Sequence, residues 1–188
     1  MVPASSPSYD RLTHDGLRTE RLTLRPAHSD DAQAVLENYA GDAEVTRYLQ
    51  WRPQVDVENV RAFLSNCRRL SDAGAELSWV LAETPLGAAI GMITLRLASP
   101  IRAQIGYVLA RPHWGRGYMP EAARAVIAYG LGALSRYRIE AYLDIENTRS
   151  ARVLEKAGMQ LEGRLRRYTV HPNLQAEPRD VLMFAACR

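Results

Sequence analysis

Short apolar β-type runs alternate with amphipathic helical segments along most of the chain, and this order restricts the fold more than any other feature. An alternating run through Leu22 and Leu24 closes at Pro26. Two helical patterns follow, one with Ser29 as the expected N-cap and one starting near Asp56, each with apolar residues three or four positions apart. The second pattern places Val60, Phe63, Leu64, Cys67 and Leu70 on one buried face, so Cys67 is interpreted as a core residue.

The second half of the chain continues the alternation. The runs 78–83 and 88–98 flank the turn sequence TPLG and predict a hairpin. After it we expect a strand at 103–110, a helix at about 119–134, a strand at 137–145, a helix at 147–159, and strands at 166–172 and 180–187. The order β-α-α-β-β-β-α-β-α-β-β predicts one mixed α/β (α+β) domain over residues 17–188, preceded by a flexible Pro- and Ser-rich tail over residues 1–16.

Charge and cysteine content argue against several classes of protein. The net charge of +3 is too small to predict nucleic-acid binding by itself. The two cysteines form no CxxC pair and the four histidines show no zinc-ligand spacing, so no metal is expected and a reducing compartment is the simplest interpretation. The first residues lack a signal-peptide pattern and no apolar run has the length of a membrane span, so a cytoplasmic location is expected.

A glycine-containing loop, HWGRG, precedes the helix expected at about 119–134. A helix N-terminus presents unpaired N–H groups, and glycines allow an anion to approach the backbone closely, as at a phosphate site. Two common phosphate motifs are nevertheless absent here. The P-loop motif requires Lys and then Ser or Thr after its last glycine, and these do not follow Gly117; the dinucleotide motif requires a third glycine where this chain has Pro120. From glycine spacing alone, an anion site and a plain turn both stay open.

The phrases around the loop identify a resemblance that the spacing does not. "IGYVLARPHWGRGYMPEA", followed about thirty residues later by "IEAYLDIENTRSARVLEKAGM" and preceded by the opening "TERLTLRP", resembles the GCN5-related N-acetyltransferase (GNAT) superfamily, and more narrowly its Rim-type branch, whose members acetylate ribosomal-protein N-termini and related amines. The resemblance covers the chain from about residue 18 onward. It implies the GNAT acyl-CoA N-acyltransferase fold, with a mixed, mostly antiparallel central sheet flanked by helices.

The resemblance also implies which residues would meet acetyl-CoA. The loop would bind the coenzyme A diphosphate through backbone N–H groups, the preceding strand would pair with the pantetheine arm and polarise the thioester carbonyl, and the "NxxS" pair would lie at the pantetheine arm and the sulfur. The coenzyme-binding residues expected on this basis are Val108, Leu109, Ala110, Gly115, Arg116, Gly117, Tyr118, Met119, Asn147 and Ser150.

Three residues depart from the family pattern. Pro112 stands where the loop motif prefers Gln or Arg, so that a phosphate contact is absent or comes from Arg111 or Arg116. Leu154 occupies the position of a tyrosine that acts as general acid in many members, and Met159 replaces a phenylalanine. Ser150 is therefore the expected substitute proton donor to the thiolate.

The acceptor implied by the family is a primary amine attacking acetyl-CoA directly in a ternary complex. Deprotonating an α-amine of pKa near 8 costs roughly 1 kcal/mol at pH 7, against about 4.6 kcal/mol for a lysine amine. Glu162 is the expected base, with Asp144 and Glu76 as alternatives. A non-catalytic acyl-CoA-binding module stays open because Leu154 replaces the tyrosine. Membrane and nucleic-acid partners are not expected, and a homodimer is left open.

Overall fold

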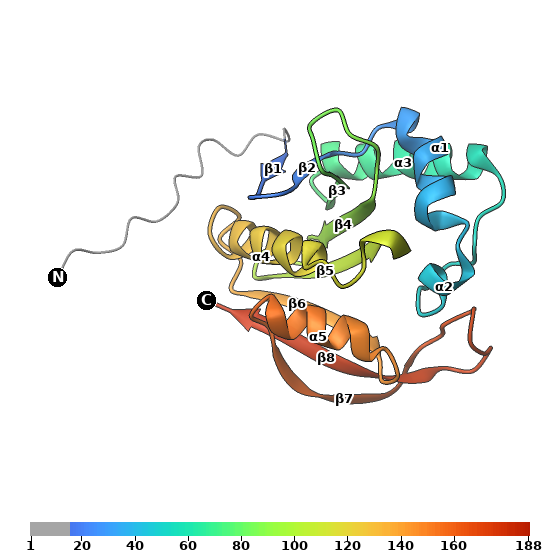
Figure 1. The fold of residues 1–188 in the computed structure, drawn as a ribbon. Helices are drawn as coiled ribbons and strands as arrows, with labels where there is room; N and C mark the ends of the chain where they lie inside the picture. Colours follow the sequence, from blue (N-terminus) through green and yellow to red (C-terminus); the bar gives the residue numbers. More distant parts are fainter. Residues whose placement is uncertain (1–15) are drawn as a thin grey trace.

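The apolar strands pair into one sheet of order β1-β2-β3-β4-β5-β6-β8-β7 in the computed structural model, which describes residues 16–188 (Figure 1). The expected tail lies outside the described residues except for Gly16. The strands are β1 Leu17–Arg18, β2 Thr23–Pro26, β3 Glu76–Ala82, β4 Gly91–Arg96, β5 Arg102–Leu109, β6 Arg138–Asp144, β7 Gln160–Thr169 and β8 Arg179–Cys187. The helices are α1 Ala32–Val35, α2 Ala43–Thr46, α3 Val57–Asp72, α4 Tyr118–Leu131 and α5 Thr148–Lys156, with 3-10 turns η1 Ser29–Asp31 and η3 Arg111–His113 and a π turn η2 Leu36–Ala40. The predicted mixed, mostly antiparallel sheet is confirmed.

The first expected strand is in fact a short hairpin. Thr19 N–H donates to the Leu22 carbonyl at 2.9 Å and closes a turn, so Leu17 pairs back against Leu24. The alternation through Leu22 and Leu24 does not distinguish this hairpin from a single strand, because both side chains are buried on either side of the end of the turn.

The first expected helix is divided into η1, α1 and η2, and its predicted N-cap is wrong. His28 caps the segment instead of Ser29: its Nδ1 accepts from Asp30 N–H at 3.3 Å, while the Asp31 carboxylate accepts from the His28 N–H at 3.1 Å. This reciprocal arrangement is a capping box, which satisfies two groups where a serine cap would satisfy one.

The second helix, α3, follows the prediction more closely. Asp56 is its N-cap, and burial raises the pKa of the Cys67 thiol to about 11, as expected for an inert core thiol. Two residues of the predicted buried face are exceptions, because the Phe63 side chain is 51% exposed and Leu70 is only half-buried. Phe63 stands at the edge of a cavity beside the sheet.

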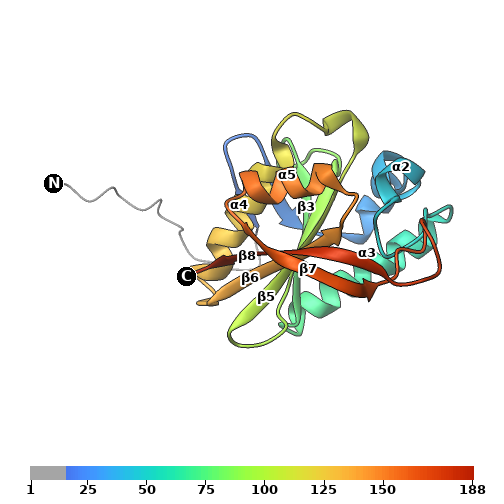
Figure 2. The same ribbon diagram turned by 90° about the horizontal axis from the view of Figure 1, so that it is seen from below.

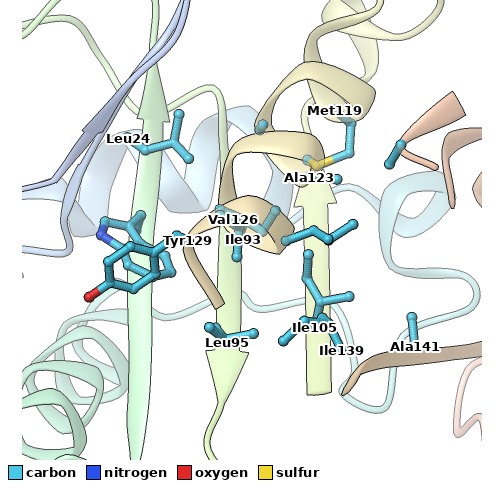
Figure 3. Close-up of a cluster of buried hydrophobic side chains, with 14 of the residues drawn as sticks. Leu24, Ile93, Leu95, Ile105, Met119, Ala123, Val126, Tyr129, Ile139 and Ala141 are labelled. Atoms are coloured by element: carbon cyan, nitrogen blue, oxygen red, sulfur yellow. The ribbon is translucent and has the colours of Figure 1, made fainter. Parts of the chain in front are cut away.

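Helices cover both faces of the sheet and give two apolar cores. Helices α4 and α5 lie on one face, with α1 and α3 on the other (Figure 2). Val126 and Ala123 of α4 pack on Ile93 and Leu95 of β4 in the larger core (Figure 3). Alternate residues of β3 divide between the cores: Trp79 and Leu81 join the α4 side and Val80 the α3 side, as the twofold period of a strand requires.

One strand pair separates partway along its length, and this opens the sheet. β5 and β6 are the parallel neighbours, and their pairing covers only Arg102↔Arg138, Ala103↔Ile139 and Gln104↔Glu140. Beyond these pairs β5 continues along β4 as far as Leu109, while β6 continues along β8 as far as Asp144. The carboxyl ends of two central strands therefore diverge and leave room between them.

Candidate active site

Two adjoining cavities occupy the opening between β5 and β6. The larger has a volume of about 480 Å³ and the smaller about 160 Å³. The two cavities have six lining residues in common, Tyr48, Leu49, Tyr107, Val108, Asn147 and Ser150. A molecule in one cavity can therefore meet a molecule in the other at the wall that these residues form.

The larger cavity is mostly apolar and aromatic, and it lies between the sheet and the segment after α2. We call the segment after α2 the roof of the cavity. Gln50 attaches this roof to the sheet, because its Nε2 donates to the Tyr142 hydroxyl at 2.6 Å and to the Thr169 hydroxyl at 2.8 Å. The rings of Tyr142 and Tyr168 meet edge to face at 4.9 Å. The cavity wall therefore presents mostly apolar and aromatic surface, interrupted by polar side chains such as Gln54 and Asn59.

The glycine loop leads from η3 into α4 beside the smaller cavity. Gly115 and Gly117 have φ values of +75° and +81°, a left-handed conformation that other residues adopt only at a cost. Within the described residues, the backbone N–H groups of five successive residues have no hydrogen-bond partner: Gly115, Arg116, Gly117, Tyr118 and Met119. Five free donors at the start of a 14-residue helix are an arrangement that favours binding of an anion.

An ion pair between residues far apart in the sequence fixes the loop. Arg21 donates from Nη1 to the Arg116 carbonyl at 2.9 Å and from Nε to Glu121 at 2.8 Å. Glu121 also accepts from the Thr19 hydroxyl at 2.6 Å. Burial raises the pKa of the Glu121 carboxyl, but the bonds from Thr19 and Arg21 outweigh burial and leave the pKa below its usual value.

The end of β5 presents fewer free donors than the sequence predicts. Ala110 N–H donates to the Ile90 carbonyl at 2.8 Å, so this predicted coenzyme contact is already occupied on the β4 side. The backbone N–H and C=O groups of successive residues in an antiparallel strand point in opposite directions, so those of Leu109 point away from β4. The Leu109 carbonyl accepts from the Trp114 indole N–H at 2.7 Å. The Leu109 N–H therefore points toward the opening and is the better placed donor for a carbonyl there.

The "NxxS" pair lies at the start of α5, where both residues line both cavities. Asn147 is the N-cap, with Oδ1 accepting from Ser150 N–H at 3.2 Å, and no hydrogen bond within the described residues involves its Nδ2 or the Ser150 hydroxyl. Asn147 is thus a structural cap that still has donors to offer. Ser150 is the third residue of the helix, and its hydroxyl is not used for capping.

Position 154, where the family pattern has a tyrosine, holds a buried leucine on the wall of the larger cavity. The phenol on the wall nearest to Ser150 is Tyr107, whose hydroxyl donates to the Ser150 carbonyl at 3.2 Å. Burial raises the pKa of Tyr107 well above its usual value. Because the Tyr107 hydroxyl proton is already donated to the Ser150 carbonyl, Tyr107 is not placed to replace the tyrosine.

The structure separates the expected base, Glu162, from the cavities. Glu162 lies on β7, pairs with Arg138 at 2.8 Å and lines neither cavity. The hydrogen bond from Arg138 lowers the pKa of Glu162, which further weakens it as a base. The structure therefore gives no geometric support to the role expected for Glu162.

The alternative carboxylates are also engaged. Asp144 is fully buried and accepts two bonds from Arg179, at 2.5 and 3.1 Å. Burial raises the pKa of Asp144, but these bonds outweigh burial and hold it below its usual value. Glu76 lines the larger cavity and accepts from Arg96 and from the Ser78 hydroxyl, each at 3.1 Å.

A histidine that is not among the predicted site residues lies at the larger cavity instead. His171 follows β7 and is 2% exposed, with its Nε2 3.7 Å from Asp144 Oδ2. Sequence reasoning could not single it out, because a lone histidine in an expected strand indicates nothing by itself.

No group of three or more His, Cys, Asp or Glu side chains gathers at metal-binding range within residues 16–188. In the same residues, no helix is long and apolar enough to cross a membrane.

Comparison with known proteins places this site in a family. Residues 21–160 match the family model of the acetyltransferase (GNAT) domain. The uncharacterized N-acetyltransferase p20 of Bacillus licheniformis is 38% identical over 154 residues, covering 81% of this chain and 86% of that protein.

Solved structures agree in fold. A GNAT-family acetyltransferase from Bacillus anthracis superposes with a TM-score of 0.78 at 29% identity, over 92% of this chain and 98% of that one. Mycobacterium smegmatis RimJ, solved in complex with CoA-disulfide, gives a TM-score of 0.78 at 26% identity, over 92% of this chain and 85% of that one. The likeness to the family and to its Rim-type members is confirmed, and the chain belongs to the GNAT acetyltransferase family and is an acyltransferase.

Proposed function

We propose that this protein is an acetyl-CoA-dependent N-acetyltransferase that moves an acetyl group to a primary amine by direct attack in a ternary complex. The observation that carries the proposal is the row of five unpartnered N–H groups at the α4 start, beside a small cavity that adjoins a larger aromatic one. The RimJ structure, which contains CoA-disulfide, supports coenzyme A as the occupant of the loop side.

Different groups of the protein would contact the different parts of acetyl-CoA. The N–H groups of residues 115–119 bind the diphosphate, and the free Nδ2 of Asn147 donates to the pantetheine arm. Leu109 N–H donates to the thioester carbonyl, where negative charge develops during attack. Pro112 is exposed and has no N–H, so backbone donors and the exposed Arg116 hold the phosphates without a side chain from position 112.

The larger cavity receives the acceptor. Its walls are mostly apolar and aromatic, which favours a primary amine carried on an apolar or aromatic body over a highly charged one. The acceptor ammonium would enter near the wall shared by Tyr107 and Ser150, where the acetyl group arrives.

The test is a thiol-release assay with acetyl-CoA and a panel of amines. Amine-dependent thiol release with formation of the acetylated amine supports the proposal. Binding of CoA without thiol release from any amine would contradict it and favour an acyl-CoA-binding module, the alternative that Leu154 leaves open.

Ser150→Ala is expected to reduce turnover about tenfold and leave acetyl-CoA affinity unchanged. The reduction is smaller than the roughly 10²–10⁴-fold typical of general acid catalysis, because a thiolate is a better leaving group than most and needs little proton transfer. Steady-state kinetics and calorimetric titration measure the two effects. Ser65→Ala, on the exposed face of α3, is the matched control. Normal turnover in Ser150→Ala would remove Ser150 from the proton path.

A further inference from the structure

His171 is a buried polar side chain that the fold itself does not satisfy. Within residues 16–188, neither of its ring nitrogens has a hydrogen-bond partner, although the residue is only 2% exposed. Leaving a buried polar group unpaired costs about 1–3 kcal/mol. His171 also lines the larger cavity, so the missing partner is available from a molecule that enters there.

The backbone around His171 is held firmly against the roof of this cavity. Asn173 Nδ2 donates to the Thr46 carbonyl at 2.7 Å and to the Trp51 carbonyl at 2.8 Å, which ties the β7–β8 connection to the α2 region. Leu174 N–H donates to the His171 carbonyl at 2.9 Å and closes a turn. The imidazole therefore holds a fixed position, as a catalytic group needs.

Burial is the main reason that the His171 ring is neutral at pH 7. Burial lowers the pKa of His171, the Asp144 carboxylate and a close polar contact with the Tyr48 backbone raise it by less, and Arg179 lowers it. Arg179 also partly neutralises Asp144, which it holds by two hydrogen bonds. The other titratable groups on this cavity wall are Tyr39, Tyr48, Glu76, Arg96, Tyr107 and Tyr142. A neutral imidazole beside a carboxylate has a lone pair free on the nitrogen that does not face the carboxylate.

No carboxylate of the described cavity wall competes with it. Glu76 is the carboxylate among those lining residues, and it already accepts from Arg96 and Ser78. Glu162 lies outside the cavity, and Asp144 is sealed behind His171 and Arg179. Among the described residues that line the cavity, the imidazole is therefore the remaining candidate base, with both of its ring nitrogens buried at the wall.

We propose that His171 is the catalytic base that accepts a proton from the acceptor ammonium, directly or through one water, with Asp144 as its positioning residue. This inference rests on the proposed function. An ammonium N–H bond breaks and its proton passes to the imidazole. The freed lone pair forms the N–C bond to the acetyl group, the C–S bond breaks with its electron pair on sulfur, and the second proton lost by nitrogen ends on the thiolate. The imidazolium then returns its proton to water.

His171→Asn tests the proposal through the pH dependence of turnover. With a lysine-type amine, whose pKa is about 10.4, we expect turnover at pH 7 to fall about 100-fold relative to wild type. The deficit should shrink to a few-fold as the pH approaches that pKa, because the amine then loses its proton without a base. Acetyl-CoA affinity and the circular dichroism spectrum should not change.

Three comparisons make the result decisive. His28→Asn, the same substitution at an exposed helix cap that Asn also favours, should keep wild-type turnover at every pH. His171→Gln provides a second variant if His171→Asn is poorly folded. Wild-type turnover in a folded His171 variant at pH 7, or an equal deficit at all pH values, would overturn the role of His171. Absence of thiol release from the wild type with any amine would instead overturn the proposed function, and this inference with it.

Discussion

Replacing Gly117 with aspartate should weaken acetyl-CoA binding by about 3 kcal/mol, or roughly 150-fold. Gly117 has φ +81°, and a Cβ there would lie 3.2 Å from Arg21 Nη2, so any side chain strains the turn and presses on the guanidinium that holds it. Aspartate also places a negative charge among the five N–H groups where the diphosphate is expected. Isothermal titration with acetyl-CoA measures the change.

Two further variants separate strain from charge. Gly117→Ala adds the strain alone. We expect the free loop to relax and binding to restore its strained form, which lowers the affinity by only about tenfold, because a left-handed residue costs about 1–2 kcal/mol. Gly74→Ala introduces the same kind of strain at φ +66° after α3, with no atom within 4 Å, and should leave the affinity unchanged. If Gly117→Asp binds acetyl-CoA as the wild type does, the loop is not the diphosphate site.

Replacing Asp144 with asparagine should destabilise the fold by about 3 kcal/mol. The substitution preserves shape but removes the charge that faces Arg179 at 2.5 Å and His171 at 3.7 Å in a fully buried position. Arg179 keeps Glu146 at 3.0 Å, which places the expected loss at the lower end of the range for a broken buried pair. Urea denaturation measures the change. Glu162→Gln, in the exposed pair with Arg138, is the isosteric control and should change stability far less.

The same groups fix the sign of the pH dependence of stability. His171 has a depressed pKa in the folded state, so its contribution is complete above 6.5 and is lost as the pH falls through the folded value. Asp144 also has a depressed pKa, so its contribution is complete above 3.8 and is lost below that. Asp144→Asn should therefore keep the loss of stability that begins below pH 6.5 and show a smaller further loss below about pH 3.8, to which Asp31 and Asp180 still contribute. An unchanged acid limb in the variant would contradict the assignment to Asp144.

The backbone geometry of the glycine loop could be predicted from the sequence because it is local. Gly115, Gly117 and the start of α4 are neighbours in the chain, and positive φ together with unpaired helix donors follows from residue type and spacing. The supporting ion pair from Arg21 to Glu121 could not be predicted in this way, since it joins residues 100 positions apart.

The larger cavity depends on tertiary structure, and most of its lining residues could not be predicted from the sequence. Glu162 lies in a sequence context that suits a site, but a strand that begins at Gln160 rather than near residue 166 places it on β7, away from the opening. His171 reaches the cavity only because Asn173 ties its loop to the segment around Thr46 and Trp51, contacts that join residues 127 and 122 positions apart. The hydrophobic periodicity of the sequence does not indicate such long-range hydrogen bonds.

The transfer of the acetyl group itself gives the most direct test of the proposed reaction. The protein is saturated with acetyl-CoA labelled in the acetyl group, and free thiol, labelled protein and labelled amide are measured before and after an amine is added. Direct attack in a ternary complex predicts no thiol and no labelled protein before the amine, followed by one thiol and one labelled amide per turnover. Thiol release with label on the protein before the amine is present, or bound CoA with no thiol release from any amine, would contradict it.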